Sequence, residues 1–151
     1  MSAANQIGDA IVSALSALGW KVSADPGADD MPVARRKTPS LPSGKEPPAV
    51  VVVVGEEGNV EYLTARKYLV SYPVAVVYIT AGGKLLGDDT TLRDRRIVIR
   101  NTIDKKSCFT SVTGFDSSSY GGRAPFNTNA LNKDLNYSVQ VFTISVQEDR
   151  P

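Results

Sequence analysis

Residues 66–81 read RKYLVSYPVAVVYITA, which is the longest run in the chain with the composition of a β-strand. Valine, isoleucine, threonine and tyrosine dominate it, and these side chains pack well on a pleated sheet. Alternate residues of a strand point to opposite faces. One face carries Tyr68, Val70, Tyr72, Val74, Val76 and Tyr78, and the other carries Leu69, Ser71, Pro73, Ala75, Val77 and Ile79. Since both faces are largely apolar, both have to be covered, and this requirement decides the fold.

A proline, Pro73, interrupts this long strand. Because proline has no N–H to donate to a neighbouring strand, it predicts either an edge position or a bulge at which the strand bends. Two glycines, Gly82 and Gly83, then close the strand.

Four other stretches complete the predicted sheet. The five valines at 50–54 predict a buried central strand. The sequence GEEGN at 55–59 predicts a turn, after which residues 60–63 begin a hairpin partner of the long strand. Residues 109–115 predict a further strand, and residues 135–147 alternate as a second long strand does.

Two stretches predict helices. In residues 5–18, apolar side chains recur at three- and four-residue spacing, and the opposite side is small, which indicates either close packing or a polar surface of small residues. Residues 88–106 have capping residues at 88–91 and lysines at the end. The IVI at 97–99 also fits a strand, but the capping residues favour a helix.

The second predicted helix has a strongly charged side. Its charged residues are Arg93, Asp94, Arg95, Arg96 and Arg100. A solvated face with i,i+4 pairs is one interpretation of this cluster. Salt bridges between subunits are another, and phosphate contact is a third, which Asp94 and Asp104 weaken by diluting the positive potential.

Two long segments predict loops. Residues 24–48 contain six prolines and two glycines, from which we expect no packed element. This segment is interpreted as an arm or hairpin extension that orders on binding a neighbour, and the alternative is a flexible solvated loop with an incidental basic triplet. Residues 116–134, rich in serine, glycine and asparagine, predict a second long loop.

Composition limits the class of protein. At 151 residues the chain has the length of one domain, 1–151. With 17 Lys and Arg against 16 Asp and Glu, it has no general attraction to nucleic acid or anionic membranes. No apolar run reaches the length of a membrane span, and the N-terminus does not resemble a signal peptide, so we expect a cytosolic protein.

The residues needed for common catalytic chemistry are missing from the sequence. With no histidine, a Ser-His-Asp or Cys-His arrangement is impossible. The single cysteine, Cys108, is expected to be a small buried apolar side chain. Acidic pairs such as Asp88 with Asp89 are adjacent residues in turn-like segments and do not converge on a site. We therefore expect no enzyme, no metal and no cofactor.

These elements predict one α+β domain: a mixed or mainly antiparallel sheet of four to five strands, two flanking helices and long loops. Two helices are enough to cover one face of such a sheet. The other face then needs a second sheet layer, the segment 24–48 or another subunit. Large uncovered apolar faces are rare in monomers, so an assembly subunit is the favoured class.

The order of the elements resembles a known family. The quoted stretches are PPAVVVVV at 47–54, YPVAVVYITA at 72–81, LRDRRIVIRNTI at 92–103 and YSVQVFTISV at 137–146. With the preceding helix and long loop, they resemble the tail-terminator proteins of long-tailed bacteriophages, also called tail-completion or minor tail proteins. Related neck proteins, such as head-closure subunits, have the same size and style and remain an alternative. A small-ligand binding module or an enzyme is less favoured.

The resemblance implies a virion protein, assembled in the cytoplasm of the bacterial host, that forms a ring, typically a hexamer. Such a ring sits on the last ring of tail tube protein, stops elongation and presents the surface for a head-completion or connector protein. Genomic DNA passes through its lumen without sequence-specific binding. Our candidate contacts at subunit interfaces or in the lumen are Arg35, Arg36, Lys37 and Arg123.

Overall fold

The computed structural model describes residues 2–23, 25–41, 44, 48–81, 89–123 and 135–149. Its elements are α1 (Ala3–Ser16), β1 (Val33–Arg35), β2 (Ala49–Val54), β3 (Asn59–Thr64), β4 (Lys67–Ala81), α2 (Asp89–Ile103), the 3₁₀ helix η2 (Lys106–Phe109), β5 (Phe115–Arg123) and β6 (Leu135–Asp149). The predicted class is confirmed: this is an α+β domain with a mixed sheet and two flanking α-helices. The sheet has six strands, more than the four to five predicted.

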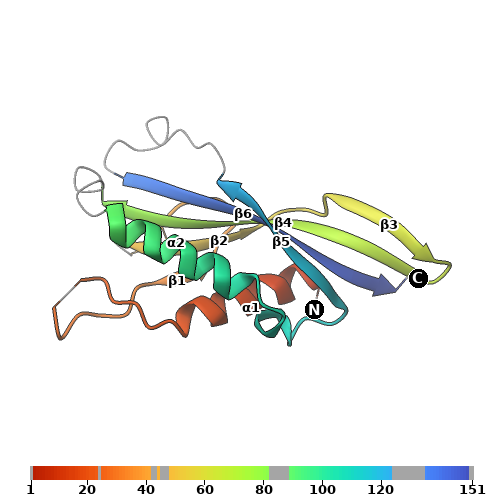
Figure 1. Cartoon of the computed structure of the whole chain (residues 1–151), viewed down its shortest axis with the longest axis horizontal. Coiled ribbons are helices and arrows are strands. Elements are labelled where there is room, and N and C mark those ends of the chain that lie inside the picture. Colours follow the sequence, from red (N-terminus) through yellow and green to blue (C-terminus); the bar gives the residue numbers. More distant parts are fainter. Residues whose placement is uncertain are drawn as a thin grey trace.

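The predicted long strand is the centre of the sheet, whose strand order is β1-β2-β4-β6-β5 (Figure 1). β4 pairs antiparallel with β6 over its full length, from Lys67 opposite Asp149 to Ala81 opposite Leu135. On its other side, β4 pairs first with β3 and then with β2. β1 is parallel to β2, and this pair makes the sheet mixed.

Pro73 lies in the gap between β3 and β2 on that second side of β4. Its carbonyl accepts a hydrogen bond from the Gly55 N–H at 2.8 Å, so its ring nitrogen faces the same gap, where the ladder needs no donor. On the β6 side, Pro73 is opposite Thr143 without a shift of register. β4 is a central strand, so the predicted edge position is wrong, and no shift of register marks a bulge against β6. Pro73 is tolerated because it lies where the pairing of β4 passes from β3 to β2.

Both helices lie where the apolar periodicity predicts them. The Ser2 Oγ caps α1 by accepting a hydrogen bond from the Asn5 N–H at 3.3 Å. The side chains that the helices bury include Ile7, Ile11 and Leu15 from α1 and Ile99 and Ile103 from α2. Residues 97–99 are helical, so the alternative of a strand there is excluded. Neither these helices nor any other in the described ranges is long and apolar enough to cross a membrane.

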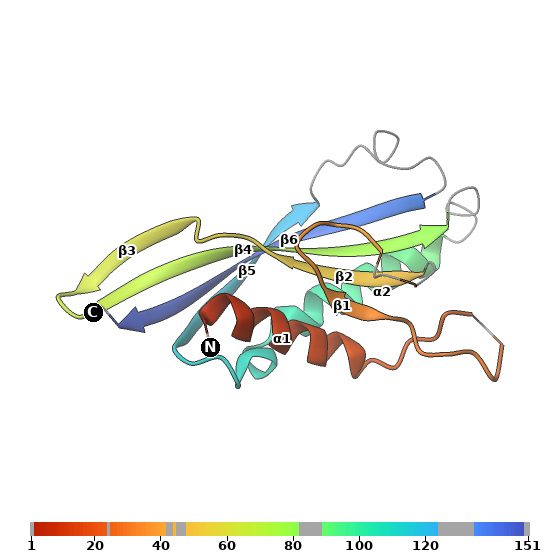
Figure 2. The ribbon, with the colours of Figure 1, turned by 180° about the vertical axis from the view of Figure 1, so that it is seen from behind.

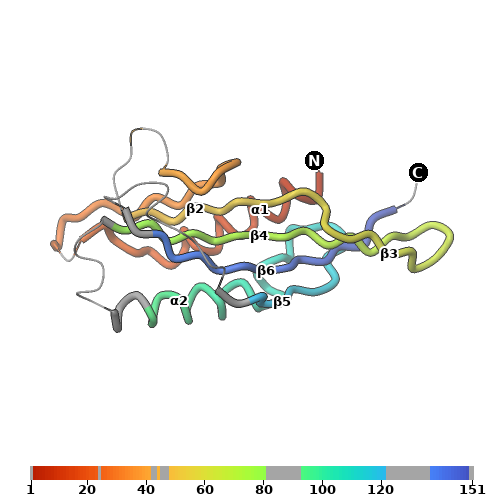
Figure 3. The backbone as a smooth tube through the Cα atoms, turned by 90° about the horizontal axis from the view of Figure 1, so that it is seen from above, coloured from red at the N-terminus to blue at the C-terminus, as the bar shows by residue number. Residues whose placement is uncertain are grey.

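The two faces of β4 are covered in different ways. The face of Val70, Val74 and Val76 belongs to the main core, which the two helices complete. The opposite face buries Val77 and Ile79, and Leu41 from the segment after β1 packs there. Figures 2 and 3 show that segment on the side of the sheet opposite α2. The chain itself therefore covers part of the second face.

The expectation that no packed element forms in residues 24–48 is wrong. Met31 is buried, and β1 follows it, with Val33 opposite Val50. Proline permits this because it lacks only the donor: the Pro32 carbonyl accepts a hydrogen bond from the Val50 N–H at 2.9 Å. That part of this segment orders on binding a neighbour stays a prediction.

Two further predictions need correction. The predicted strand at 109–115 is instead the end of η2 and turns, in which Phe109 is buried and stacks on Phe115 at 4.7 Å between ring centroids. The predicted loop at 116–134 begins as β5, which pairs with β6 and has two shifts of register. Its serines suit an edge strand that is partly exposed to solvent. Residues 124–134 lie outside the described residues.

Candidate functional site

The predicted basic triplet lines a cavity of about 510 Å³. The start of α1, the chain after β1, the turn after β2 and Tyr72 of β4 form its walls. Three cations, Arg35, Arg36 and Lys37, face the two carboxylates of Glu56 and Glu57 across this space. Five charged side chains thus line this one cavity.

Arg35 clamps β1 to α1. Its guanidinium donates to the Asn5 carbonyl oxygen at 3.1 Å and to the Asn5 side-chain oxygen, and forms an ion pair with Asp9 at 3.5 Å. Gly8 makes room for it, because a Cβ there would lie 2.3 Å from the Arg35 Cδ. These contacts assign Arg35 a structural role within the chain.

Arg36 and Lys37 differ from Arg35 in their surroundings. The Arg36 N–H donates to the Val52 carbonyl at 3.0 Å, which extends the β1–β2 ladder, and its Nε donates to Ser40 Oγ at 3.3 Å. Lys37 is exposed. Of the triplet, Lys37 is therefore the best placed to meet an anionic partner in solution.

Arg123 is not brought together with the triplet. It ends β5, where its Cα partner is Gln140 of β6, whereas Arg35 ends β1. β1 and β5 are the two opposite edges of the sheet. A single DNA-facing surface that contains all four predicted residues is therefore not formed within one copy of the chain.

Tyr72, in the cavity wall, is a hydrogen-bond donor. Its hydroxyl donates to the Glu148 carboxylate at 3.0 Å. Burial raises the pKa of Tyr72 from 10.0 to about 12, with further contributions from the hydrogen bond to Glu148 and from the charges of Glu148 and Glu57. The phenol therefore stays protonated at physiological pH and does not act as a base.

We expect this raised pKa to make the fold sensitive to alkali. Below pH 10 Tyr72 is protonated in both folded and unfolded chains, so its stabilising contribution is complete. Between about pH 10 and 12 only the unfolded chain loses this proton, and the free energy of unfolding falls. Urea denaturation over this pH range should show a shallower decline for Tyr72→Phe than for the wild type. Equal slopes for the two proteins would contradict the expectation.

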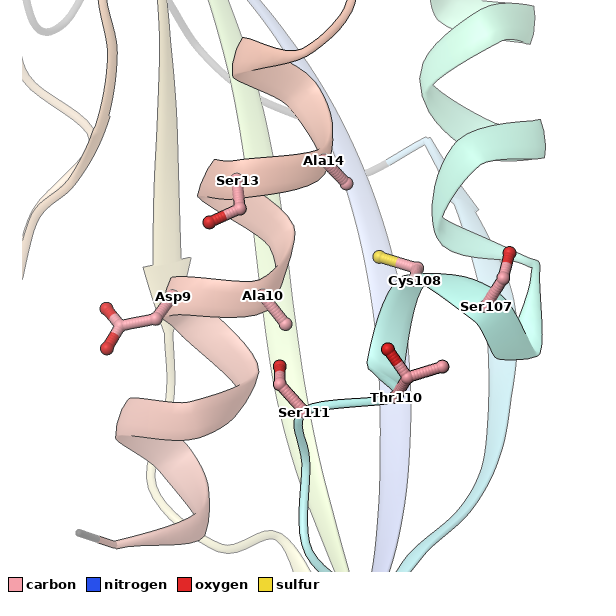
Figure 4. A pocket seen from close by; sticks show the side chains of 8 residues that line it. All are labelled: Asp9, Ala10, Ser13, Ala14, Ser107, Cys108, Thr110 and Ser111. Carbon is pink, nitrogen blue, oxygen red and sulfur yellow. The ribbon is translucent and has the colours of Figure 1, made fainter.

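A second cavity, of about 360 Å³, lies between α1 and η2 (Figure 4). Small side chains surround it, among them Ala10, Ala14 and Ser111, with the Cys108 thiol near its centre. Cys108 is half-buried rather than fully buried and packs against the main core. Burial raises the pKa of this thiol to about 11, so it is neutral and a weak nucleophile at physiological pH.

Three of the four arginines of α2 contact side chains of the sheet or Trp20 in the same chain, which none of the three interpretations of the cluster anticipates. Arg95 stacks over Trp20, with 4.9 Å from its Cζ to the ring centroid, and donates to the Tyr78 hydroxyl. Arg96 donates to Ser138 Oγ, and Arg100 lies 5.8 Å from the ring centroid of Tyr120. These contacts attach α2 to the sheet through cation–π and hydrogen-bond contacts. No local pattern predicts them, because the aromatic partners come from distant segments.

Exposed apolar side chains form the feature that sequence reasoning missed. Among the described residues, the large ones are Val60, Tyr62 and Leu63 on β3 and Ile97 and Val98 on α2. The alternation of Val60 and Tyr62 with Glu61 indicates a strand with one apolar face. Nothing local in the sequence, however, indicates that this face lacks a covering helix.

Metal-ligating side chains do not cluster in the part of the chain that the structure describes. No group of three or more His, Cys, Asp or Glu side chains in them is close enough together to hold a metal ion. The arrangement provides a charged cavity, a neutral thiol and two exposed apolar patches. In comparisons with known proteins, no protein-family model and no curated protein matches this sequence.

Proposed function

We propose that this chain is a structural virion protein that forms a homo-oligomeric ring on a phage tail tube. The ring stops elongation of the tube and provides the surface for joining the head. The exposed apolar surface of β3 is the observation that supports this proposal best. Tyr62 is 67% exposed and has Val60 and Leu63 beside it. Exposure of this apolar surface to water costs free energy, and contact with a neighbouring subunit would remove that cost.

The arrangement of the sheet adds support. In Figure 1, β3 and the adjoining ends of β4 and β6 project beyond the two helices as a ribbon. A projecting ribbon has few contacts within its own chain and is well suited to reach another subunit. The proposed partners are further copies of the chain in a hexamer, the tail tube protein and a head-completion or connector protein.

Contact with DNA in the lumen is proposed for Lys37, with Arg36 beside it. Arg35 is less available for this role, because Asn5 and Asp9 hold its guanidinium. The acidic Glu56 and Glu57 across the cavity weaken the attraction to phosphate. Any contact is therefore weak, independent of sequence and sensitive to salt, as passage of DNA requires.

Electron microscopy of phage particles made without this protein tests the proposal. We expect tails of unregulated, excess length without attached heads, because the tube has no terminator and no joining surface. Supplying the wild-type chain in trans is the control and should restore joined tails of uniform length.

Two other outcomes would contradict the proposal. Tails of normal length that fail to join heads would instead favour a head-closure subunit. Normal, joined particles would leave the second candidate, a small-ligand binding module, for which the charged cavity of about 510 Å³ is the specific observation.

A further inference from the structure

We infer that the apolar face of β3 binds the outward face of α2 on a second copy of this chain. This inference rests on the proposed function for the closed ring and deepens it by naming the contact between neighbours. The two surfaces are called the strand patch, Val60 and Tyr62, and the helix patch, Ile97 and Val98.

The strand patch is a continuation of the face on which the core is built. Val60 is opposite Val70 and Tyr62 is opposite Tyr68 in the β3–β4 ladder, and opposite residues lie on the same face. Val70 is 2% exposed, whereas Val60 is 43% exposed. In Figure 1 the helices end before β3 begins. Within the part of the chain that the structure describes, no helix therefore covers the strand patch.

The helix patch is the converse. α2 buries Ile99 and Ile103 against the sheet, yet Ile97 is 45% and Val98 is 38% exposed. A helix that covers one sheet needs one apolar stripe, and these two residues lie outside it. The described part of the chain thus has an apolar sheet face that no helix covers and an apolar helix face that packs on no sheet. In α+β folds such helix faces pack on such sheet faces, so the two surfaces suit each other.

Charge favours this pairing over contacts between identical patches. β3 carries Glu61 and no cation, a net charge of −1. α2 carries four arginines against two aspartates, a net charge of +2. Pairing of two β3 edges would bring acidic segments together, and pairing of two α2 helices would bring basic ones together, whereas β3 on α2 joins opposite charges.

The geometry also decides the symmetry of the assembly. β3 and α2 lie toward opposite ends of the molecule in Figure 1, so the patches of one copy do not meet. A contact between two different patches is heterologous and leaves one patch of each kind open at the ends of any chain of subunits. Repetition of this contact gives a closed ring where the rotation allows it and a filament where it does not.

Directed cross-linking tests the contact. In a Cys108→Ala background, Thr64→Cys places a thiol at the end of β3, two residues from Tyr62, and Asn101→Cys places one a helical turn from Ile97. Both wild-type residues are exposed. The two variants, one with a mass tag, are mixed over a concentration series with a short bis-maleimide. We expect the yield of cross-linked dimers between Thr64→Cys and Asn101→Cys to be well above the yield of dimers that either variant forms alone. Adding Tyr62→Lys to the first variant should reduce the mixed product at least about tenfold, which corresponds to 1.4 kcal/mol.

The matched control is Ser119→Cys, an exposed position on β5, mixed with Thr64→Cys. Mixed product no greater than in this control, or Thr64→Cys linked chiefly to itself, would overturn the inference. Oligomers that form in light scattering without the expected cross-link would also overturn it, yet leave the proposed ring with another interface. The proposed function fails separately, in the microscopy of particles that lack the protein.

Discussion

Replacing Phe142 by alanine is expected to lower the free energy of unfolding by about 3–5 kcal/mol. Phe142 lies in the middle of β6, is 1% exposed and packs against the ring of Tyr120 at 5.2 Å between centroids. It is also opposite Val74 of the central strand, in the core beneath the helices. The truncation leaves a cavity that side chains from several elements cannot fill without leaving their own positions.

Urea denaturation followed by circular dichroism measures this loss. Thr143→Ala is the matched control, because Thr143 is the next residue of the same strand, lies on the opposite face and is only half-buried. We expect the control to change the free energy of unfolding by no more than about 1 kcal/mol. Equal effects of the two substitutions would show that the core does not lie on the face of Val74.

Gly114→Ala is the second substitution with a large expected effect. It should lower the free energy of unfolding by about 2–4 kcal/mol. Gly114 has φ of +78°, a conformation that costs other residues roughly 1–2 kcal/mol. A Cβ there would also lie 2.2 Å from the Gln147 carbonyl oxygen, which is backbone and cannot rotate away. Relief of this clash disturbs the 2.7 Å hydrogen bond from the Gln147 N–H to the Gly114 carbonyl, worth roughly 1 kcal/mol.

Gly19→Ala separates the two causes. Gly19 also has a positive φ, +68°, but a Cβ there would meet no atom within 4 Å. Thermal and urea unfolding of both variants should therefore show the smaller loss for Gly19→Ala, from backbone conformation alone. If the two losses agree within error, the close approach of Gly114 to β6 is not a determinant of stability.

The strands and helices that could be predicted are those whose own residues determine their structure. β4 follows from its β-branched and aromatic composition, and α1 from the spacing of Ile7, Ile11 and Leu15. For Pro73, local chemistry predicts an unpaired side of the strand, because the donor is missing, but not its place in a central strand. Segments with such internal periodicity need little information from the rest of the fold.

The elements that could not be predicted depend on a neighbour for their structure. β1 has only three residues among prolines, and it is a strand because β2 offers a parallel edge. β5 has the serine and glycine content of a loop, and pairing with β6 makes it a strand. Such tertiary effects override local propensity and leave no periodic signal in the sequence.

The candidate site shows the same division. The basic triplet at 35–37 is visible as a run of charges, and its members do line one cavity. The Arg35 guanidinium donates hydrogen bonds to Asn5 because β1 approaches α1 closely at Gly8, and the sequence does not reveal this approach. Likewise, the exposure of Tyr62 depends on where the helices end in space, not on its own surroundings in the sequence.

The pairing of β4 with β6 has a consequence for how the protein is made. It joins residues as far apart in the chain as Lys67 and Asp149, and such non-local pairing slows folding because a long loop has to close first. During translation, β4 leaves the ribosome well before β6. Until β6 is made, one hydrogen-bonding edge of this apolar central strand has no partner strand. A nascent chain in this state is exposed to aggregation, and low temperature or chaperone overexpression should raise the soluble yield.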